Sequence, residues 1–107
     1  MKRGDFVSIA MQGDFGKPRP ALIIQAEEFN QLSSITILPL TITLINASLL
    51  RIDIEPSLYN GLEEHSQVMI DKITTIKKDK IGKILGYATH ETMLQIERCL
   101  AVFLGIV

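Results

Sequence analysis

The chain has a single cysteine, no long apolar run and almost no net charge, and each of these shortages excludes a class of protein. With Cys99 alone, no disulfide can form within the chain and no cysteine cage can hold a metal. The 11 Lys+Arg residues against 12 Asp+Glu residues give a formal net charge of −1. That balance removes the general electrostatic attraction of nonspecific nucleic-acid binders, so any nucleic-acid site must be local.

No stretch of the sequence reaches about 18 uninterrupted apolar residues, the length that a membrane helix needs. The start, Met1-Lys2-Arg3-Gly4-Asp5, passes from basic residues into an alternating segment without the apolar stretch of a signal peptide. We therefore expect a cytoplasmic protein with no membrane association. The 107 residues, 47% of them hydrophobic and 21% charged, suit one globular domain spanning residues 1–107.

Alternating apolar and polar residues, separated by Gly, Pro and Asn turns, predict six short strands. The expected ranges are Phe6–Ala10, Pro20–Gln25, Ile35–Leu40, Leu50–Ile54, Val68–Ile76 and Ile81–Tyr87. Gly82 and Gly86 in the last of these predict a bulge or a close approach of another segment. The first two ranges form a hairpin around the Gly/Pro loop at residues 13–18.

From Thr89 onward the apolar spacing changes to that of a helix, which Thr89 can cap. One face carries residues spaced 3, 4, 3 and 4 apart, namely Met93, Ile96, Leu100, Phe103 and Val107. Six strands and one C-terminal helix indicate a mainly β (β+α) domain, a strongly bent antiparallel sheet or small barrel with the helix packed on it. A second apolar row, Leu94, Ala101 and Leu104, favours burial in a two-fold dimer, unless it only widens the intramolecular stripe.

The segment from Gly13 to Gln25 places Arg19 between two prolines directly ahead of an apolar strand. Pro18 and Pro20 each fix φ near −65°, so the Arg19 side chain leaves the strand in a defined direction. A guanidinium held in this way is a planar fork of five donors that suits a phosphate or a carboxylate. Pairing with a nearby carboxylate at the rim of the barrel is the alternative interpretation of Arg19.

Four short motifs occur in a characteristic order along the chain. They are Arg3-Gly4-Asp5, Gly16-Lys17-Pro18-Arg19-Pro20-Ala21-Leu22, Pro39-Leu40-Thr41, and Val68-Met69-Ile70-Asp71-Lys72-Ile73-Thr74-Thr75-Ile76 followed by Ile81-Gly82. Together they resemble the MazF/PemK family of toxin components of type II toxin–antitoxin systems, over nearly the whole chain. The resemblance implies an SH3-like β-barrel with a C-terminal α-helix, a homodimer, and an endoribonuclease that cuts single-stranded RNA at preferred sequences without a metal or other cofactor. It also implies an antitoxin partner whose disordered tail, usually acidic, covers the RNA groove.

The same resemblance assigns catalytic positions. Arg19 matches the catalytic arginine, Thr41 the second active-site residue, and Asp71 the aspartate that some PemK-type members are proposed to use as a base. A guanidinium holds its proton tightly, so we expect Arg19 to stabilise charge on the phosphate rather than to donate a proton. Those PemK-type members carry an arginine where this chain has Met69, and many others carry one where it has Thr74, which removes positive charge from the expected groove.

Further RNA contacts are predicted from residue type and position. Lys17 is the expected phosphate contact beside Arg19, and Gln12 and Asp14 are candidate readers of base edges. Thr43 competes with Thr41, because two residues further along a strand the side chain faces the same way. Asp71 could equally hold a lysine or a backbone amide.

Other polar residues and two other functions stay as alternatives. His65 and His90 could act as the paired imidazoles of a ribonuclease, but nothing in the sequence brings them together. Cys99 is expected to be a small core side chain rather than a nucleophile. The ending from Phe103 to Val107 resembles that of the CcdB-type gyrase poisons, although the chain has no tryptophan. The third interpretation is a noncatalytic SH3-like binding module.

Overall fold

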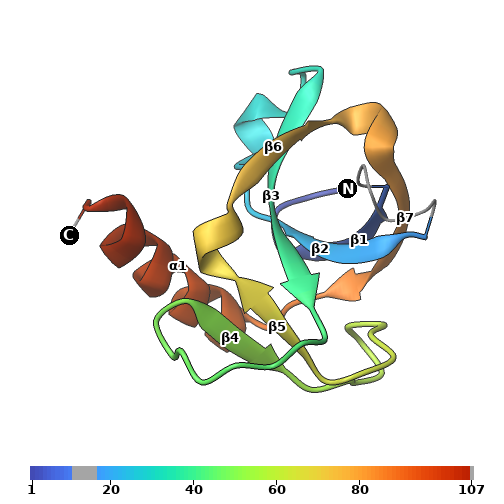
Figure 1. The fold of residues 1–107 in the computed structure, drawn as a ribbon. Coiled ribbons are helices and arrows are strands. Elements are labelled where there is room, and N and C mark those ends of the chain that lie inside the picture. Colours follow the sequence, from blue (N-terminus) through green and yellow to red (C-terminus); the bar gives the residue numbers. More distant parts are fainter. Residues whose placement is uncertain (11–16, 107) are drawn as a thin grey trace.

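The computed structural model describes residues 1–10 and 17–106. Within these ranges, seven strands, three short 3-10 helices and one α-helix follow one another along the chain (Figure 1). The strands are β1 (Asp5–Ile9), β2 (Arg19–Ile23), β3 (Ser34–Thr41), β4 (Arg51–Ile54), β5 (Ser66–Met69), β6 (Thr74–Lys77) and β7 (Ile81–Tyr87). The helices are η1 (Glu27–Phe29), η2 (Ile70–Lys72), η3 (Lys78–Lys80) and α1 (His90–Leu104).

The strands pair in antiparallel fashion, and the sheet runs in the order β4-β5-β3-β2-β1-β7, with β6 also pairing with β3. Figure 1 shows β6, β3, β2, β1 and β7 curling around a common centre. Among the described residues β6 and β7 are not paired, so the sheet is rolled without closing into a complete barrel. The predicted mainly β domain with a C-terminal helix is confirmed.

The prediction of one long strand over Val68–Ile76 is wrong. The first half of β3 pairs with β6 and its last two residues pair with β5, so the chain must pass between two partners of the same strand. The 3-10 turn η2 makes this step, and its first residue, Ile70, is buried and donates its N–H to the Leu50 carbonyl (2.9 Å). β-branched composition alone cannot show this break.

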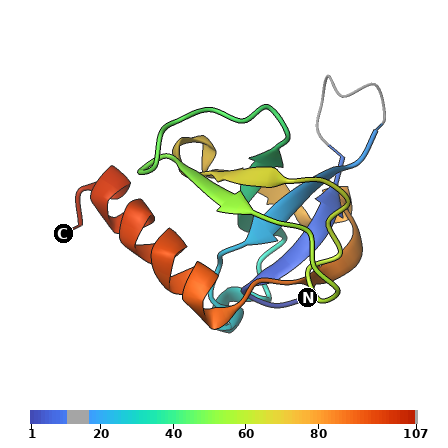
Figure 2. The same ribbon diagram turned by 90° about the horizontal axis from the view of Figure 1, so that it is seen from below.

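Alternation along the strands divides the core into two clusters, one on each side of the curved sheet. The inner cluster lies within the roll and consists of Val7, Ile9, Ala21, Ile23, Ile35 and Ile37. The outer cluster contains Phe6, Leu22, Leu38 and Ile52 of the sheet together with Met93, Ile96 and Cys99 of α1. The helix therefore packs on the outer face of the sheet, beside β4 and β5 (Figure 2).

The start of α1 follows the prediction, because the Thr92 N–H donates to Thr89 Oγ1 at the N-terminus (3.1 Å). The C-terminal half differs from it. Cys99 is buried, as predicted, whereas the side chain of Phe103, expected on the packed face, is 44% exposed. There the helix passes beyond the sheet, and a cavity of about 550 Å³ opens between Val102 and Phe103 and the segment 46–50. No helix in the described ranges is long and apolar enough to cross a membrane.

Candidate functional site

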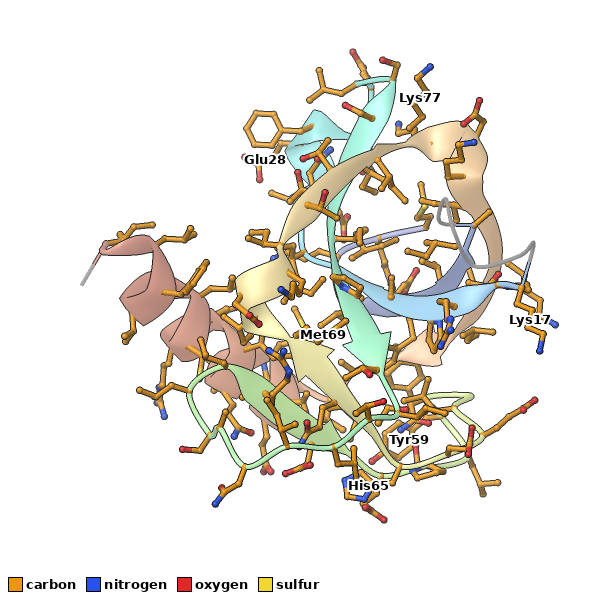
Figure 3. All side chains as sticks on the ribbon, in the orientation of Figure 1. Lys17, Glu28, Tyr59, His65, Met69 and Lys77 are labelled. Atoms are coloured by element: carbon orange, nitrogen blue, oxygen red, sulfur yellow. The ribbon has the colours of Figure 1, made fainter. Side chains whose placement is uncertain are left out.

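Arg19 lies at the first position of β2 with its side chain exposed. The strand begins there because Pro18 and Pro20 favour extended backbone on either side of it. The arginine lines a cavity of about 710 Å³, which falls within the range of ligand pockets, roughly 300–1,000 Å³. Lys17, which Figure 3 labels just before β2, and Lys83 of β7 line the same cavity. Three cationic side chains therefore meet in one depression of a chain with no net positive charge.

Further described residues line the cavity from strands, from the positions next to β2 and β3, and from the loop that joins β4 to β5, residues 55–65, which we call the β4–β5 loop. They are Ser8, Pro18, Pro20, Ile42, Gly61, Leu62, Glu63, Glu64, Ser66 and Leu85. The apolar members among them are prolines and aliphatic side chains, which can contact a base, and the cations offer donors to its phosphate. The arrangement is suited to a short piece of an anionic single strand.

Thr41 ends β3 close to this cavity. Ala21 of β2 pairs with Pro39 of β3. Two residues further along, the same register places Arg19 opposite Thr41, on the same face of the sheet. The Thr43 N–H donates to Thr41 Oγ1 (3.0 Å), which fixes the oxygen and leaves the hydroxyl hydrogen available to a ligand. Ile42, between the two threonines, lines the cavity, whereas neither threonine lines it.

The structure does not bring Asp71 to this cavity. Asp71 belongs to η2, and its carboxylate is paired with the Arg51 guanidinium of β4, both side chains being largely buried. Lys72 approaches the same carboxylate at 3.8 Å. The main partner of Asp71 is thus an arginine, whereas the alternative expected from the sequence was a lysine or a backbone amide. Gln12 and Asp14 lie outside the described residues.

Neither histidine lines the cavity. His65 Nδ1 lies 2.8 Å from Glu55 Oε1, and its Nε2 lies 3.1 Å from Asp53 Oδ1. Hydrogen bonds from Gln67 and then from His65 lower the pKa of the Asp53 carboxyl below its ordinary value. His65 thereby joins the β4–β5 loop to β4, and His90 is exposed at the start of α1. In residues 1–10 and 17–106, no three His, Cys, Asp or Glu side chains converge to hold a metal ion.

Sequence reasoning missed three charged residues of the cavity: Lys83, Glu63 and Glu64. Lys83 reaches it because β7 pairs with β1, so the last strand of the sheet lies beside the first. The two glutamates reach it through the fold of the β4–β5 loop. No local pattern around these residues differs from that of an ordinary solvated turn or strand, so only the tertiary contacts reveal them.

Comparison with known proteins matches residues 2–104 to the family described as PemK-like, MazF-like toxin of type II toxin-antitoxin system. The chain is 43% identical over 107 residues to a protein of Mycolicibacterium smegmatis named "Probable endoribonuclease MazF", an alignment that covers 99% of this chain and 98% of that protein.

Among solved structures, one titled "Endoribonuclease in complex with its cognate antitoxin from Mycobacterial species" has a TM-score of 0.85 and 27% identity, covering 100% of this chain and 97% of that one. "Mycobacterium tuberculosis toxin MazF-mt6" has a TM-score of 0.79 at 22% identity, covers 96% of this chain and 97% of its own, and supports the fold.

Proposed function

Because the chain belongs to the PemK-like, MazF-like family of toxins of type II toxin–antitoxin systems, we propose that it is an endoribonuclease that cuts single-stranded RNA and so inhibits translation and growth. The observation that supports this most strongly is the exposed Arg19, which lies with Lys17 and Lys83 in a cavity of about 710 Å³. The relative named as an endoribonuclease matches 99% of this chain. The domain 1–107 is proposed to act as one unit.

In the proposed reaction the 2′-hydroxyl of the RNA attacks the adjacent phosphorus, and the 5′-oxygen of the next nucleotide leaves. The 2′-hydroxyl loses its proton to water and the leaving 5′-oxygen takes one from water, so no net proton is consumed. The products are a 2′,3′-cyclic phosphate and a 5′-hydroxyl. Charge develops on the nonbridging oxygens of the pentacoordinate phosphorus, and fixed donors aimed at that charge lower the barrier most. The Arg19 guanidinium can donate two parallel N–H groups to these oxygens. The Thr41 hydroxyl, at the end of β3 and level with Arg19, supplies a neutral donor.

The remaining contacts position the strand. Lys17 is assigned to a neighbouring phosphate as a point charge, and Thr43, exposed at the turn after β3, to the ribose-phosphate backbone. Lys83 is assigned the same role, a contact to the RNA backbone, because it lines the cavity. The contacts predicted for Gln12 and Asp14 remain predictions.

Asp71 remains a prediction as the general base, and two substitutions separate that role from a structural one. If Asp71 is the general base, Asp71→Asn loses cleavage and Arg51→Gln does not. If Asp71 is only the ion-pair partner of Arg51, both variants have a lower free energy of unfolding and the cleavage rate of the folded protein is unchanged. Since the pair lies outside the cavity, we expect the second result, with a loss of about 3 kcal/mol when one partner of a mostly buried pair is removed. Urea unfolding and single-turnover cleavage measure the two quantities, and a loss of at least about 100-fold in cleavage for Asp71→Asn alone would establish the base.

We propose two protein partners. The first is a cognate antitoxin, because the 27% identical neighbour was solved with one; an acidic tail would suit the cations of the cavity. The second is another copy of this chain. Val102, Phe103 and Leu104 on the last turns of α1 and Leu49 are each 44–59% exposed, and packing against a second copy would remove these apolar side chains from water. A cytoplasmic location, where the RNA and the antitoxin are made, is part of the same proposal.

Two other functions are less well supported. A gyrase poison would use the C-terminal residues and would leave the cationic cavity without a role. A binding module would not require the arginine to be directed by two prolines. The family match and the cavity lining together favour the ribonuclease.

The test is incubation of the purified protein with a long single-stranded RNA in the presence of EDTA. Discrete cuts with 2′,3′-cyclic phosphate ends are expected. Intact RNA together with inhibited DNA gyrase would replace the proposal by the gyrase poison. Intact RNA together with uninhibited gyrase would leave a binding module. Protection of the RNA from cleavage when the purified antitoxin is added beforehand would assign the partner.

A further inference from the structure

The β4–β5 loop is held in place by a buried asparagine. Asn60 is 3% exposed, and its Oδ1 accepts the N–H groups of Ser57 (3.1 Å) and Leu62 (3.0 Å). Its Nδ2 donates to the Glu55 carbonyl (2.8 Å), and its own N–H donates to Ser57 Oγ (3.1 Å). A loop with such an internal framework does not rearrange freely, because each lost hydrogen bond would leave a buried polar group unsatisfied.

The same loop lies against β7. The Tyr87 N–H donates to the Tyr59 carbonyl (2.9 Å), and the rings of these two tyrosines stack with centroids 5.4 Å apart. A Cβ at Gly86 would overlap the Tyr59 carbonyl oxygen. At the end of the loop, Ser66 Oγ donates to the Glu64 carbonyl (2.9 Å). The backbone that carries Glu63 and Glu64 is thereby fixed relative to the strands that carry Arg19 and Lys83.

Glu63 and Glu64 are exposed side chains that line the cavity from this fixed backbone, so their carboxylates repel the phosphates of an anionic strand bound there. Such a placement weakens binding unless the carboxylates receive hydrogen bonds from another part of the ligand. The donors that a single-stranded nucleic acid offers are the amino and imino groups on the Watson–Crick edges of its bases. A carboxylate accepts well from the N4 amino group of cytosine, the N6 amino group of adenine and the paired N–H groups of guanine. Uracil offers one N–H between two carbonyl oxygens, which repel a carboxylate.

We propose that Glu63 and Glu64 read a base of the RNA and select against uracil at the position that faces the β4–β5 loop. This inference rests on the proposed function, because the bound strand is taken to be single-stranded RNA. Lys17, Arg19 and Lys83 hold the backbone, and the glutamates accept from the base that this placement directs toward them. The carboxylates lower the affinity for every strand, and hydrogen bonds restore it only where the base carries an amino donor. The protein therefore prefers strands with such a base at this position.

The experiment measures binding rather than cutting, using single-stranded 2′-O-methyl decamers of cytidine and of uridine, which lack the attacking hydroxyl. The two bases have the same ring size and differ at the edge in question. Fluorescence anisotropy should show that the wild-type protein binds the cytidine decamer about 10-fold more tightly than the uridine decamer, the size expected for one well-formed contact to a base edge. The double variant Glu63→Gln/Glu64→Gln should reduce this ratio to below about 2-fold, and the single variants should show which glutamate contributes more.

The matched control is Glu28→Gln, which removes the same charge from η1, away from Lys17 and the cavity (Figure 3). It should retain the 10-fold ratio. Equal binding of the two decamers by the wild-type protein would overturn the inference. So would a double variant that binds both decamers more tightly with the ratio intact, because the glutamates would then act by repulsion alone. A protein that discriminates between the decamers but never cuts RNA would refute the proposed ribonuclease while supporting the base-reading role.

Discussion

Replacing Arg19 by alanine should lower the rate of RNA cleavage by about 10²- to 10³-fold, the loss typical when one preorganised donor to a transition-state charge is removed. The fold should survive, because Arg19 is exposed at the first position of β2 and the core residues of that strand begin at Ala21. The measurement is single-turnover cleavage of a labelled single-stranded RNA, with circular dichroism and size-exclusion chromatography to confirm the folded state and its assembly.

Two control variants sharpen this prediction. Arg98→Ala removes an arginine from α1, outside the cavity, and should cut at the wild-type rate. Arg19→Lys keeps the charge but loses the planar fork, so it should recover only part of the lost rate. Cleavage by Arg19→Ala at the wild-type rate would mean that the reacting phosphate lies elsewhere.

Replacing Gly61 by alanine should destabilise the domain strongly, although the change adds only one methyl group. Gly61 has a φ of +68°, which costs an L-residue about 1–2 kcal/mol. Its Cβ would also overlap the Leu85 carbonyl oxygen of β7, so that the loop or the strand must move, at a further cost of about 1–3 kcal/mol. A fall in melting temperature of at least about 10 °C is expected for a domain of this size.

The control for Gly61→Ala is Gly105→Ala. Gly105 ends α1 with a φ of +72°, and a Cβ there would meet nothing within 4 Å. This variant therefore carries the backbone cost alone, about 1 kcal/mol. Thermal unfolding of both variants isolates the cost of the close approach. Equal, small shifts in melting temperature would mean that the β4–β5 loop does not lie against β7 as described.

Patterns that depend on neighbouring residues predicted the fold well. The alternation in β1, β2 and β7 and the cap at Thr89 are local, and the structure reproduces them within a few residues. The break at η2 was missed because it arises from β3, whose two ends pair with different strands far along the chain. Phe103 has the spacing of a core residue but lies where the sheet no longer extends beneath the helix.

The candidate site shows the same division. Arg19 and Lys17 could be predicted because the signal is local: two prolines and two nearby glycines indicate a basic side chain held in a defined direction. Asp71 has the residue type of a base, yet its partner Arg51 is 20 residues away, so its ion pair is invisible in the local sequence. Lys83 and the two glutamates join the cavity only because β7 lies beside β1 and the β4–β5 loop is folded around Asn60.

The role of the Arg19 cavity is tested most directly by a matched pair of RNA oligonucleotides that differ by one hydroxyl. Once a cut has been mapped, the nucleotide on its 5′ side is replaced by the 2′-deoxy form, and both strands are incubated with the protein in EDTA. We predict that the all-ribose strand is cut at that bond and carries a cyclic phosphate, whereas the substituted strand stays intact there. Cleavage of both strands at equal rates would show that the RNA does not supply its own nucleophile, and would contradict the role assigned to the Arg19 cavity.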